Sequence, residues 1–291
     1  MDKIFNSFNN TLLKKIINVY DDTISSGFGD YLRGSFCFFQ ICKILNLTFD
    51  MDMSKHSLSK FLITNNTNYI KIMDLNDNNF LGMDEHGTPI KNSMIFLKKI
   101  IRILNNHNEE TLYIFSNAFP IFSNISNINR DFIKSKIQMN SFLQDNMNIR
   151  LKNSNITPNN YNVIHIRSGD SFLLNNDKNI SRDYINKLVF ILSKLSINKI
   201  KHFLISDNNT LKIILKKIFP QLVIKITEIA HSGNEQNQIK SDSALMFSML
   251  DFYTMSYANK IYCITCYDHG SGFSRYCAVS YNIPYTQVIC K

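Results

Sequence analysis

Short apolar segments alternate with longer amphipathic ones in the carboxyl-terminal half of the chain, and this alternation limits the possible folds most. The segments of strand length are 163–166, 201–207, 222–226, 260–264 and 285–290; those of helical length are 181–196, 209–218, 242–258 and 273–282. Strands that alternate with helices predict a parallel, doubly wound α/β sheet. Ser181 and Asp183 suit the start of the first of these helices.

Polar residues follow three of the predicted strands, directly after Ile166, Ile205 and Ile264. Open parallel sheets bind ligands at the carboxyl ends of their strands. We therefore expect these three strand ends to face one crevice.

The segment 163–170, Val-Ile-His-Ile-Arg-Ser-Gly-Asp, predicts a buried strand that ends in a tight turn. A guanidinium at such a strand end is a natural partner for a phosphate, because its planar fork donates two parallel hydrogen bonds. The segment therefore indicates an anion site built around Arg167. A structural ion pair between Arg167 and Asp170 is the alternative.

The amino-terminal half opens with a second α/β pattern. Residues 3–20 predict a helix, or a helix that runs into a strand; a turn-rich loop at 21–30, a helix at 31–45 and a strand at 46–51 follow. Together they predict a βαβ unit. Gly27 and Gly29 would let the backbone approach a ligand at the amino terminus of the helix, or serve only the geometry of the turn.

Residues 54–150 carry a weaker pattern. It predicts helices around 56–63, 92–106 and 129–145 and a strand at 111–116. His56 and His107 are expected at the surface. Asp84 and Glu85, beside a histidine, form a polar cluster that suits either a general base or a solvated turn.

A polar linker at 152–160 predicts the boundary between two domains, 1–155 and 156–291. The chain of 291 residues is long enough for both, and a hydrophobic fraction of 44% argues against global disorder. No apolar run is long enough to span a bilayer, and the first residues do not resemble a signal peptide. These features predict a soluble cytoplasmic protein.

The net charge of +9 comes from lysines scattered along the chain. A nucleotide-phosphate pocket, a lysine-rich surface or a polyanion partner would each account for it. No zinc finger, RNP motif or arginine-rich helix supports nucleic-acid binding. Cys263 and Cys266 form one CxxC motif without a second pair at metal spacing, so buried thiols are expected rather than a zinc or redox site.

Three motifs together resemble the superfamily of α-1,2-, α-1,6- and protein O-fucosyltransferases. Residues 27–33 (Gly-Phe-Gly-Asp-Tyr-Leu-Arg) look like its glycine loop and helix, and 165–170 look like its HxRxGD donor-binding strand. Residues 251–258 followed by 271–274 look like its carboxyl-terminal helix, strand and serine loop. The motifs span nearly the whole chain, whereas 54–150 matches nothing in the family.

The resemblance implies a GT-B architecture, with two Rossmann-like doubly wound domains that face a central cleft. It implies an acceptor-side domain at 1–155, a GDP-fucose-binding domain at 156–291, and inverting transfer of fucose to a glycan hydroxyl. No cofactor or metal is implied, and the sequence lacks a DxD motif of the kind that holds a divalent ion on a diphosphate.

When the motifs are matched position by position, the resemblance implies that Arg167 stabilises the leaving diphosphate. It implies that His165 contacts the donor or holds Arg167. His165 also suits an ordinary core histidine. Asp207 would bind guanine or ribose, and Asp251 would orient the site or be merely paired. The implied donor-binding residues are Gly27, Gly29, Arg33, His165, Arg167, Gly169, Asp170, Asp207, Asp251, Ser271, Phe273 and Ser274.

An inverting transfer needs a base for the acceptor hydroxyl. Asp30 is the first candidate, and Asp84 and Glu85 are its rivals. Two other functions stay open: a GT-B transferase that uses another nucleotide sugar, and a non-catalytic nucleotide- or sugar-binding protein.

Overall fold

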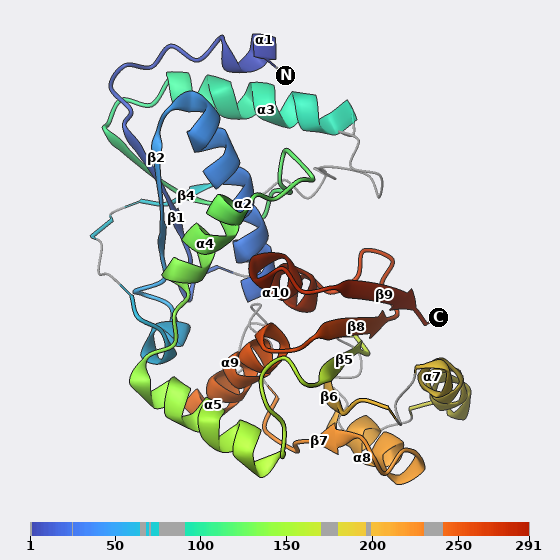
Figure 1. The fold of residues 1–291 in the computed structure, drawn as a ribbon. Coiled ribbons are helices and arrows are strands. Elements are labelled where there is room, and N and C mark those ends of the chain that lie inside the picture. The colour runs from blue at the N-terminus through green and yellow to red at the C-terminus, as the bar shows by residue number, and fades with distance from the viewer. Residues whose placement is uncertain are drawn as a thin grey trace. The chain divides into compact units, whose positions relative to one another are not determined.

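The computed structural model describes residues 2–24, 26–64, 68–69, 71–75, 91–169, 180–195, 199–229 and 241–290. The described residues form two compact units, within 1–138 and 139–291, and each unit contains one parallel sheet (Figure 1). Helix α5 (Ser141–Asn153) precedes the linker but belongs to the second unit. The functional domains 1–155 and 156–291 stay a prediction.

The first unit is built on a four-stranded parallel sheet in the order β2-β1-β4-β3. Its strands are β1 (Lys15–Val19), β2 (Thr48–Asp52), β3 (Met73–Asp74) and β4 (Thr111–Phe115). Its helices are α1 (Asp2–Phe5), α2 (Phe28–Leu45), the 3-10 helix η1 (Ser57–Phe61), α3 (Lys91–Asn105) and α4 (Asn127–Lys136). Because β1 and β2 pair in parallel and α2 connects them, the predicted βαβ unit is confirmed.

Helix α2 packs closely on the first sheet because one of its central residues is a glycine. A Cβ at Gly34 would lie 1.6 Å from the carbonyl oxygen of Ser116, which directly follows β4. Buried Asn18 on β1 joins the same elements: its Nδ2 donates to Ser35 Oγ on α2 (2.9 Å), and its Oδ1 accepts from the Ser116 amide (3.1 Å). These bonds satisfy a polar side chain within the core.

The second unit is built on a five-stranded parallel sheet in the order β7-β6-β5-β8-β9. Its strands are β5 (Asn162–Arg167), β6 (His202–Ser206), β7 (Val223–Ile224), β8 (Lys260–Thr265) and β9 (Tyr285–Ile289). Its helices are α5, α7 (Arg182–Lys194), α8 (Asn209–Ile218), α9 (Asp242–Ser256) and α10 (Gly272–Tyr281). The predicted order of strands and helices in this half is confirmed.

Alternate residues of β5 face two different surroundings. Ile164 and Ile166 pack into an apolar core with residues of α7 and α8, including Leu188 and Leu211. His165 lies between them in sequence and so projects to the other face, where its ring meets Phe273 of α10. Helices α7 and α8 begin at side-chain caps, as Ser181 Oγ accepts from the Tyr184 amide (3.1 Å).

Two predictions for residues 54–150 are wrong. The helix expected at 129–145 is two helices, because the Gln138 carbonyl accepts from the Ile63 amide (2.8 Å) and Asn140 caps α5. His56, expected at the surface, is only 3% exposed. Its ring stacks on Tyr20, with centroids 4.1 Å apart, and its Nδ1 accepts from the Leu58 amide (3.0 Å).

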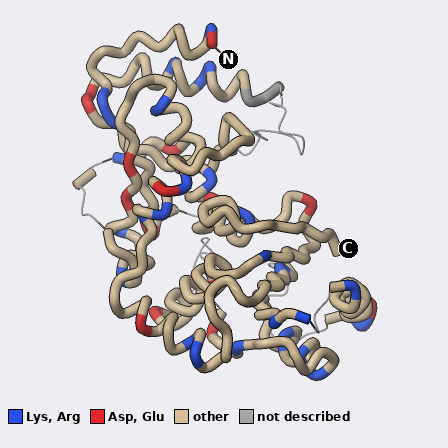
Figure 2. Tube along the Cα trace, in the orientation of Figure 1, with Lys and Arg blue, Asp and Glu red and all other residues tan. Residues whose placement is uncertain are grey.

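Lys and Arg lie along the described chain of both units with Asp and Glu among them, as the scattered lysines of the sequence indicated (Figure 2). Within the described ranges, no helix combines the length and the apolar character needed to cross a bilayer.

Candidate functional site

The three polar strand ends predicted from the sequence are neighbours in the second sheet. Strand β5 lies between β6 and β8, and the chain moves outward from β5 in one direction through β6 and β7, then in the other through β8 and β9. The switch point of this sheet therefore falls between β5 and β8. Open α/β sheets bind ligands at this position.

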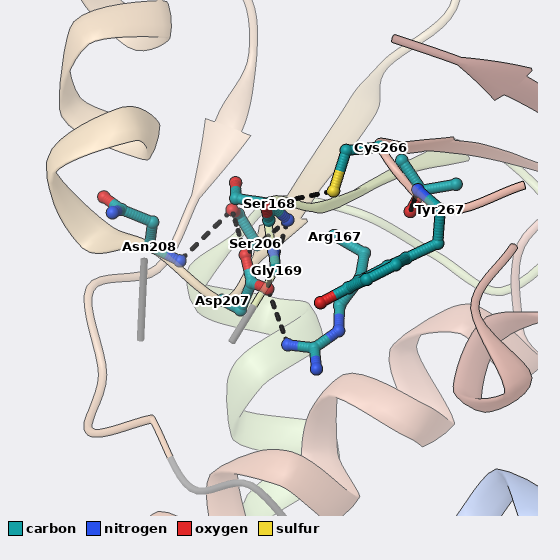
Figure 3. Close-up of polar contacts among 9 residues, drawn as sticks. Arg167, Ser168, Gly169, Ser206, Asp207, Asn208, Cys266 and Tyr267 are labelled. Atoms are coloured by element: carbon teal, nitrogen blue, oxygen red, sulfur yellow. Dashed lines mark hydrogen bonds and ion pairs between the residues drawn. The ribbon is translucent and has the colours of Figure 1, made fainter. Parts of the chain in front are cut away.

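Asp207 organises the turn that follows β5 (Figure 3). Its Oδ2 accepts from Arg167 Nη1 at 2.7 Å and from the Gly169 amide at 3.2 Å, and its Oδ1 accepts from the Ser168 amide at 2.9 Å. The carboxylate is 8% exposed. A buried charge needs such partners, because desolvation without them is costly. Asp207 thus joins the ends of β5 and β6.

Side chains hold the backbone that follows Asp207 in a turn. Ser206 Oγ accepts from the Asn208 amide (3.2 Å), and Asn208 Oδ1 accepts from the Leu211 amide (2.8 Å) to cap α8. The sequence predicted a polar turn here and a helix at 209–218, as found. Its capping pattern, a polar residue three positions before Leu211, was the signal that the helix begins at this strand end.

Gly169 ends the β5 turn in a backbone conformation that favours glycine, with φ of +111°. A Cβ there would also lie 3.1 Å from the hydroxyl of Tyr267 and 3.5 Å from the sulfur of Cys266. Cys266 Sγ donates to the Ser168 carbonyl at 3.3 Å (Figure 3). The loop after β8 therefore packs on the turn after β5. The predictions did not include Cys266 or Tyr267 in the site, because sequence spacing does not show which loops meet.

The start of α10 lies on the same face of the sheet as His165. Ser271 is the amino-terminal cap residue of α10, is 6% exposed and makes no side-chain capping bond. The Phe273 ring lies 6.2 Å from the His165 ring, and Ser274 is fully buried. The structure therefore brings together His165 and Phe273, which belong to two different motifs and were both predicted to bind the donor.

Asp251 lies on α9 and bonds to Arg150 of α5. Arg150 is 7% exposed, and its guanidinium also lies over the Phe203 ring, 5.0 Å from the centroid. The structure thus shows the paired carboxylate that the sequence left as one alternative for Asp251. A direct role of Asp251 toward a donor stays a prediction.

The predicted loop at 21–30 is shorter than expected, because α2 begins at Phe28. Gly27 is its cap residue, with extended backbone, and its carbonyl accepts from the amide of Asp30 (2.9 Å). Gly29 and Asp30 therefore lie in the first turn of the helix. Neither Gly27 nor Gly29 is among the residues with positive φ.

Arg33 ties the start of α2 to the segment after β4. Its Nε donates to the Asn117 carbonyl, its guanidinium lies 4.2 Å from the centre of the Phe119 ring, and its Nη2 lies 3.2 Å from Asp30 Oδ1. Gly27, Gly29, Asp30 and Arg33 are thus gathered at one end of α2, as their motif predicted.

Three predicted residues, Asp84, Glu85 and Asp170, lie outside the described residues. The sequence does contain the Asp-x-Asp spacing at Asp50-Met51-Asp52 on β2, but this segment differs from a metal-holding motif because Lys15 (2.9 Å) and Lys136 (2.7 Å) bind Asp50. In the part of the chain that the structure describes, no three His, Cys, Asp or Glu residues are placed to hold a metal ion.

Comparison with solved structures finds this architecture in fucosyltransferases. A crystal structure of NodZ α-1,6-fucosyltransferase soaked with GDP-fucose matches with a TM-score of 0.53 and 11% identity, over 92% of each chain. A mutant of Arabidopsis thaliana FUT1 in complex with GDP matches with a TM-score of 0.54 and 6% identity, over 98% of this chain and 74% of that one. The chain has the fold of these fucosyltransferases.

This fucosyltransferase fold is GT-B, with a Rossmann-like parallel sheet in each unit, as the resemblance implied. NodZ from Bradyrhizobium matches again in a separate structure at 12% identity, with a TM-score of 0.52. No family model and no curated protein matches the sequence. The likeness is therefore one of fold, and the function must be argued from the residues of the site.

Proposed function

We propose that this chain is an inverting fucosyltransferase that moves fucose from GDP-fucose to a hydroxyl of a glycan, without a metal. The arrangement of Arg167, Asp207 and the Ser168 and Gly169 amides at the switch point carries the proposal. The fold supports it, since NodZ with this fold was soaked with GDP-fucose and the Arabidopsis protein was crystallised with GDP.

Arg167 is the proposed catalytic residue. When the glycosidic bond to fucose breaks, negative charge develops on the GDP diphosphate. A guanidinium has five N–H donors, so it can bind Asp207 and a phosphate at once. Asp207 fixes the guanidinium before the donor arrives, and a preorganised donor of this kind typically stabilises a transition state by about 3 to 4 kcal/mol.

The start of α10 is the second proposed contact with the donor. The first amides of a helix lack intrahelical partners and favour anions. Ser271, Phe273 and Ser274 lie there, and the Phe273 ring meets His165. We assign this helix start to the phosphates and His165 to the donor, with Gly169 allowing close approach of the turn.

The first unit supplies the remaining proposed groups. Gly27, Gly29 and Arg33 would contact the donor, and Asp30 would accept the proton of the attacking hydroxyl. Arg33 lies 3.2 Å from Asp30 and holds it on the first turn of α2. Asp84 and Glu85 stay rival bases.

Calorimetric titration of the full chain with GDP, GDP-fucose, GDP-mannose and UDP, each with and without EDTA, tests the proposal. We expect GDP and GDP-fucose to bind with EDTA present and Arg167→Ala to lose binding. Arg167→Lys should restore it only in part, because lysine lacks the fork. Arg182→Ala, at an exposed arginine of α7, is the matched control and should bind normally.

The pattern of ligands separates the alternatives. Preference for GDP-mannose or a UDP-sugar would replace fucose with another donor. Binding of GDP-fucose without turnover on any glycan acceptor would indicate a non-catalytic binding protein. Normal turnover by folded Arg167→Ala would refute the assignment of Arg167.

A further inference from the structure

Cys263 is a buried thiol in the middle of β8 that has no part in the proposed function. It is the register partner of His165 on the adjacent strand β5. Partners in neighbouring strands project to the same face of a sheet, so the thiol and the imidazole share the face covered by α10. Cys263 is fully buried and His165 is 5% exposed.

Three polar side chains surround this thiol. They are His165 on β5, Ser274 on α10 and Tyr285 on β9. Each has a buried polar atom, namely His165 Nδ1, Ser274 Oγ and the Tyr285 hydroxyl, that lacks a hydrogen-bond partner of good geometry among the described residues. Buried polar atoms without partners are rare and costly, so this cluster calls for a physical explanation.

A thiolate would satisfy these groups better than a thiol. A neutral thiol donates one weak hydrogen bond, whereas a sulfur anion accepts from several donors at once. Burial raises the pKa of Cys263, but the nearby donors, His165 first among them, outweigh burial and lower its pKa below the ordinary value. Cys277, which is buried on α10 and donates to the Phe252 carbonyl, shows the opposite: burial raises its pKa.

We propose that Cys263 is a positioning residue which, as a thiolate, accepts the ring N–H of His165 and fixes the imidazole where the donor diphosphate would bind. The positioning role rests on the proposed function, in which His165 contacts the donor. The existence of the thiolate beside His165 does not. Cys263 itself touches no substrate and acts only through the imidazole.

The thiolate can be measured without any ligand. The ultraviolet absorbance of thiolate is followed against pH for the wild-type chain, Cys263→Ser and the control Cys277→Ser. We expect the wild-type spectrum minus that of Cys263→Ser to show a thiolate that forms at a pH below the ordinary range of a cysteine, and the Cys277→Ser difference to show none there. His165→Gln should move the titration of Cys263 to higher pH. Thermal unfolding confirms that each variant is folded, and Cys263→Ala replaces the serine variant if that one fails to fold.

GDP titration then tests positioning. Cys263→Ser should bind GDP about tenfold more weakly than the wild type, as expected for the loss of one charge-assisted hydrogen bond that orders a binding group. Cys277→Ser should bind normally. Ionisation of the Cys263 thiol at or above the ordinary pKa of a cysteine, or wild-type GDP affinity in folded Cys263→Ser, would overturn the proposal. A thiolate without GDP binding in any variant would instead defeat the proposed function and leave the Cys263–His165 contact standing.

Discussion

Asp207 is the residue on which the β5 turn depends, and its replacement should expose that dependence. Asp207→Ala removes the carboxylate that accepts from the partly buried guanidinium of Arg167 and from the Ser168 and Gly169 amides. Breaking a buried pair from one side costs about 3 to 5 kcal/mol. We expect the free energy of unfolding in urea to fall by roughly 3 kcal/mol.

A double-mutant cycle shows whether Arg167 and Asp207 act together. Arg167→Ala with Asp207→Ala should destabilise the chain by clearly less than the sum of the single changes, with a coupling of about 1 to 3 kcal/mol. Asp183→Ala, which removes an exposed carboxylate paired with Lys187, is the control and should leave stability nearly unchanged. Additive single effects would contradict the arrangement.

Asp30 is the proposed base, and a pH–rate profile tests it. A base must be ionised to accept the proton of the acceptor, so kcat/KM should fall on the acid side of its titration. Asp30→Asn should lower kcat/KM by about 100-fold or more and remove this acid limb, because an amide cannot accept the proton. An unchanged profile in Asp30→Asn would exclude Asp30 as the base and leave Glu85 and Asp84 as the candidates.

At the scale of elements, the contact of α2 with the end of β4 requires Gly34. Replacing a glycine inside a helix by alanine ordinarily stabilises the helix by about 1 kcal/mol. Here the added methyl would lie 1.6 Å from the Ser116 carbonyl oxygen, so the two elements must separate. We expect Gly34→Ala to destabilise the chain by roughly 1 to 3 kcal/mol in urea unfolding. Stabilisation by this change would refute the close contact.

Asp50 joins three elements of the first unit. It should make the free energy of unfolding of that unit fall at acid pH. Burial raises the pKa of Asp50, but hydrogen bonds from Lys136 and Lys15 outweigh burial and lower it. A carboxyl whose pKa is lowered by folding adds stability above its unfolded pKa, about 3.9 for Asp. That stability is lost as the pH falls through the lower, folded pKa.

The measurement is the free energy of unfolding from pH 7 down into this acid range. We expect Asp50→Asn to reduce stability at pH 7 and to approach the wild type as the pH falls, because the wild type then loses the same ion pairs. A constant difference between the two proteins at every pH would show that Asp50 contributes through packing alone.

The elements of the second unit were largely predictable, because its strands are long apolar runs between capped helices. The element starts of the first unit were not. His56 is polar in sequence, yet stacking on Tyr20 buries it, and the helix expected at 129–145 breaks where Gln138 bonds to Ile63. Both outcomes depend on contacts between segments far apart in the chain. Periodicity carries no information about such contacts.

The site, too, was predictable from local sequence but not from contacts between distant segments. The residue types at 165–169 indicated an anion site, since a strand, a guanidinium and a glycine turn follow one another. Nothing in the sequence indicated that Asp207 would hold the turn or that Cys263 would face His165. Those pairings follow from the order β6-β5-β8, which is a property of the whole sheet.

At the scale of the whole molecule, each unit has a sheet with its own switch point. In the first sheet it falls between β1 and β4, and Arg33 bonds to the backbone of Asn117, the second residue after β4. In the second it falls between β5 and β8, at Arg167 and Gly169. Some predicted donor-binding residues of each unit, Arg33 in the first and Arg167 and Gly169 in the second, therefore lie by a switch point, where α/β proteins bind ligands. If one donor molecule contacts residues of both units, protection from hydrogen exchange can be measured in each unit separately.

Hydrogen exchange of the full chain with GDP and with GDP-fucose tests whether the second unit binds the nucleotide and the first unit contacts the sugar. We expect GDP to slow exchange at 167–169 and after β6 and β8, and GDP-fucose to slow it also at 27–33. The first amides of α2 lack intrahelical partners, so their exchange should be fast until a ligand contacts them. Arg33→Ala should remove the added protection by GDP-fucose while keeping that by GDP. Equal protection by both ligands would assign donor recognition to the second unit alone, and protection at 27–33 by GDP itself would place the nucleotide, rather than the sugar, against α2.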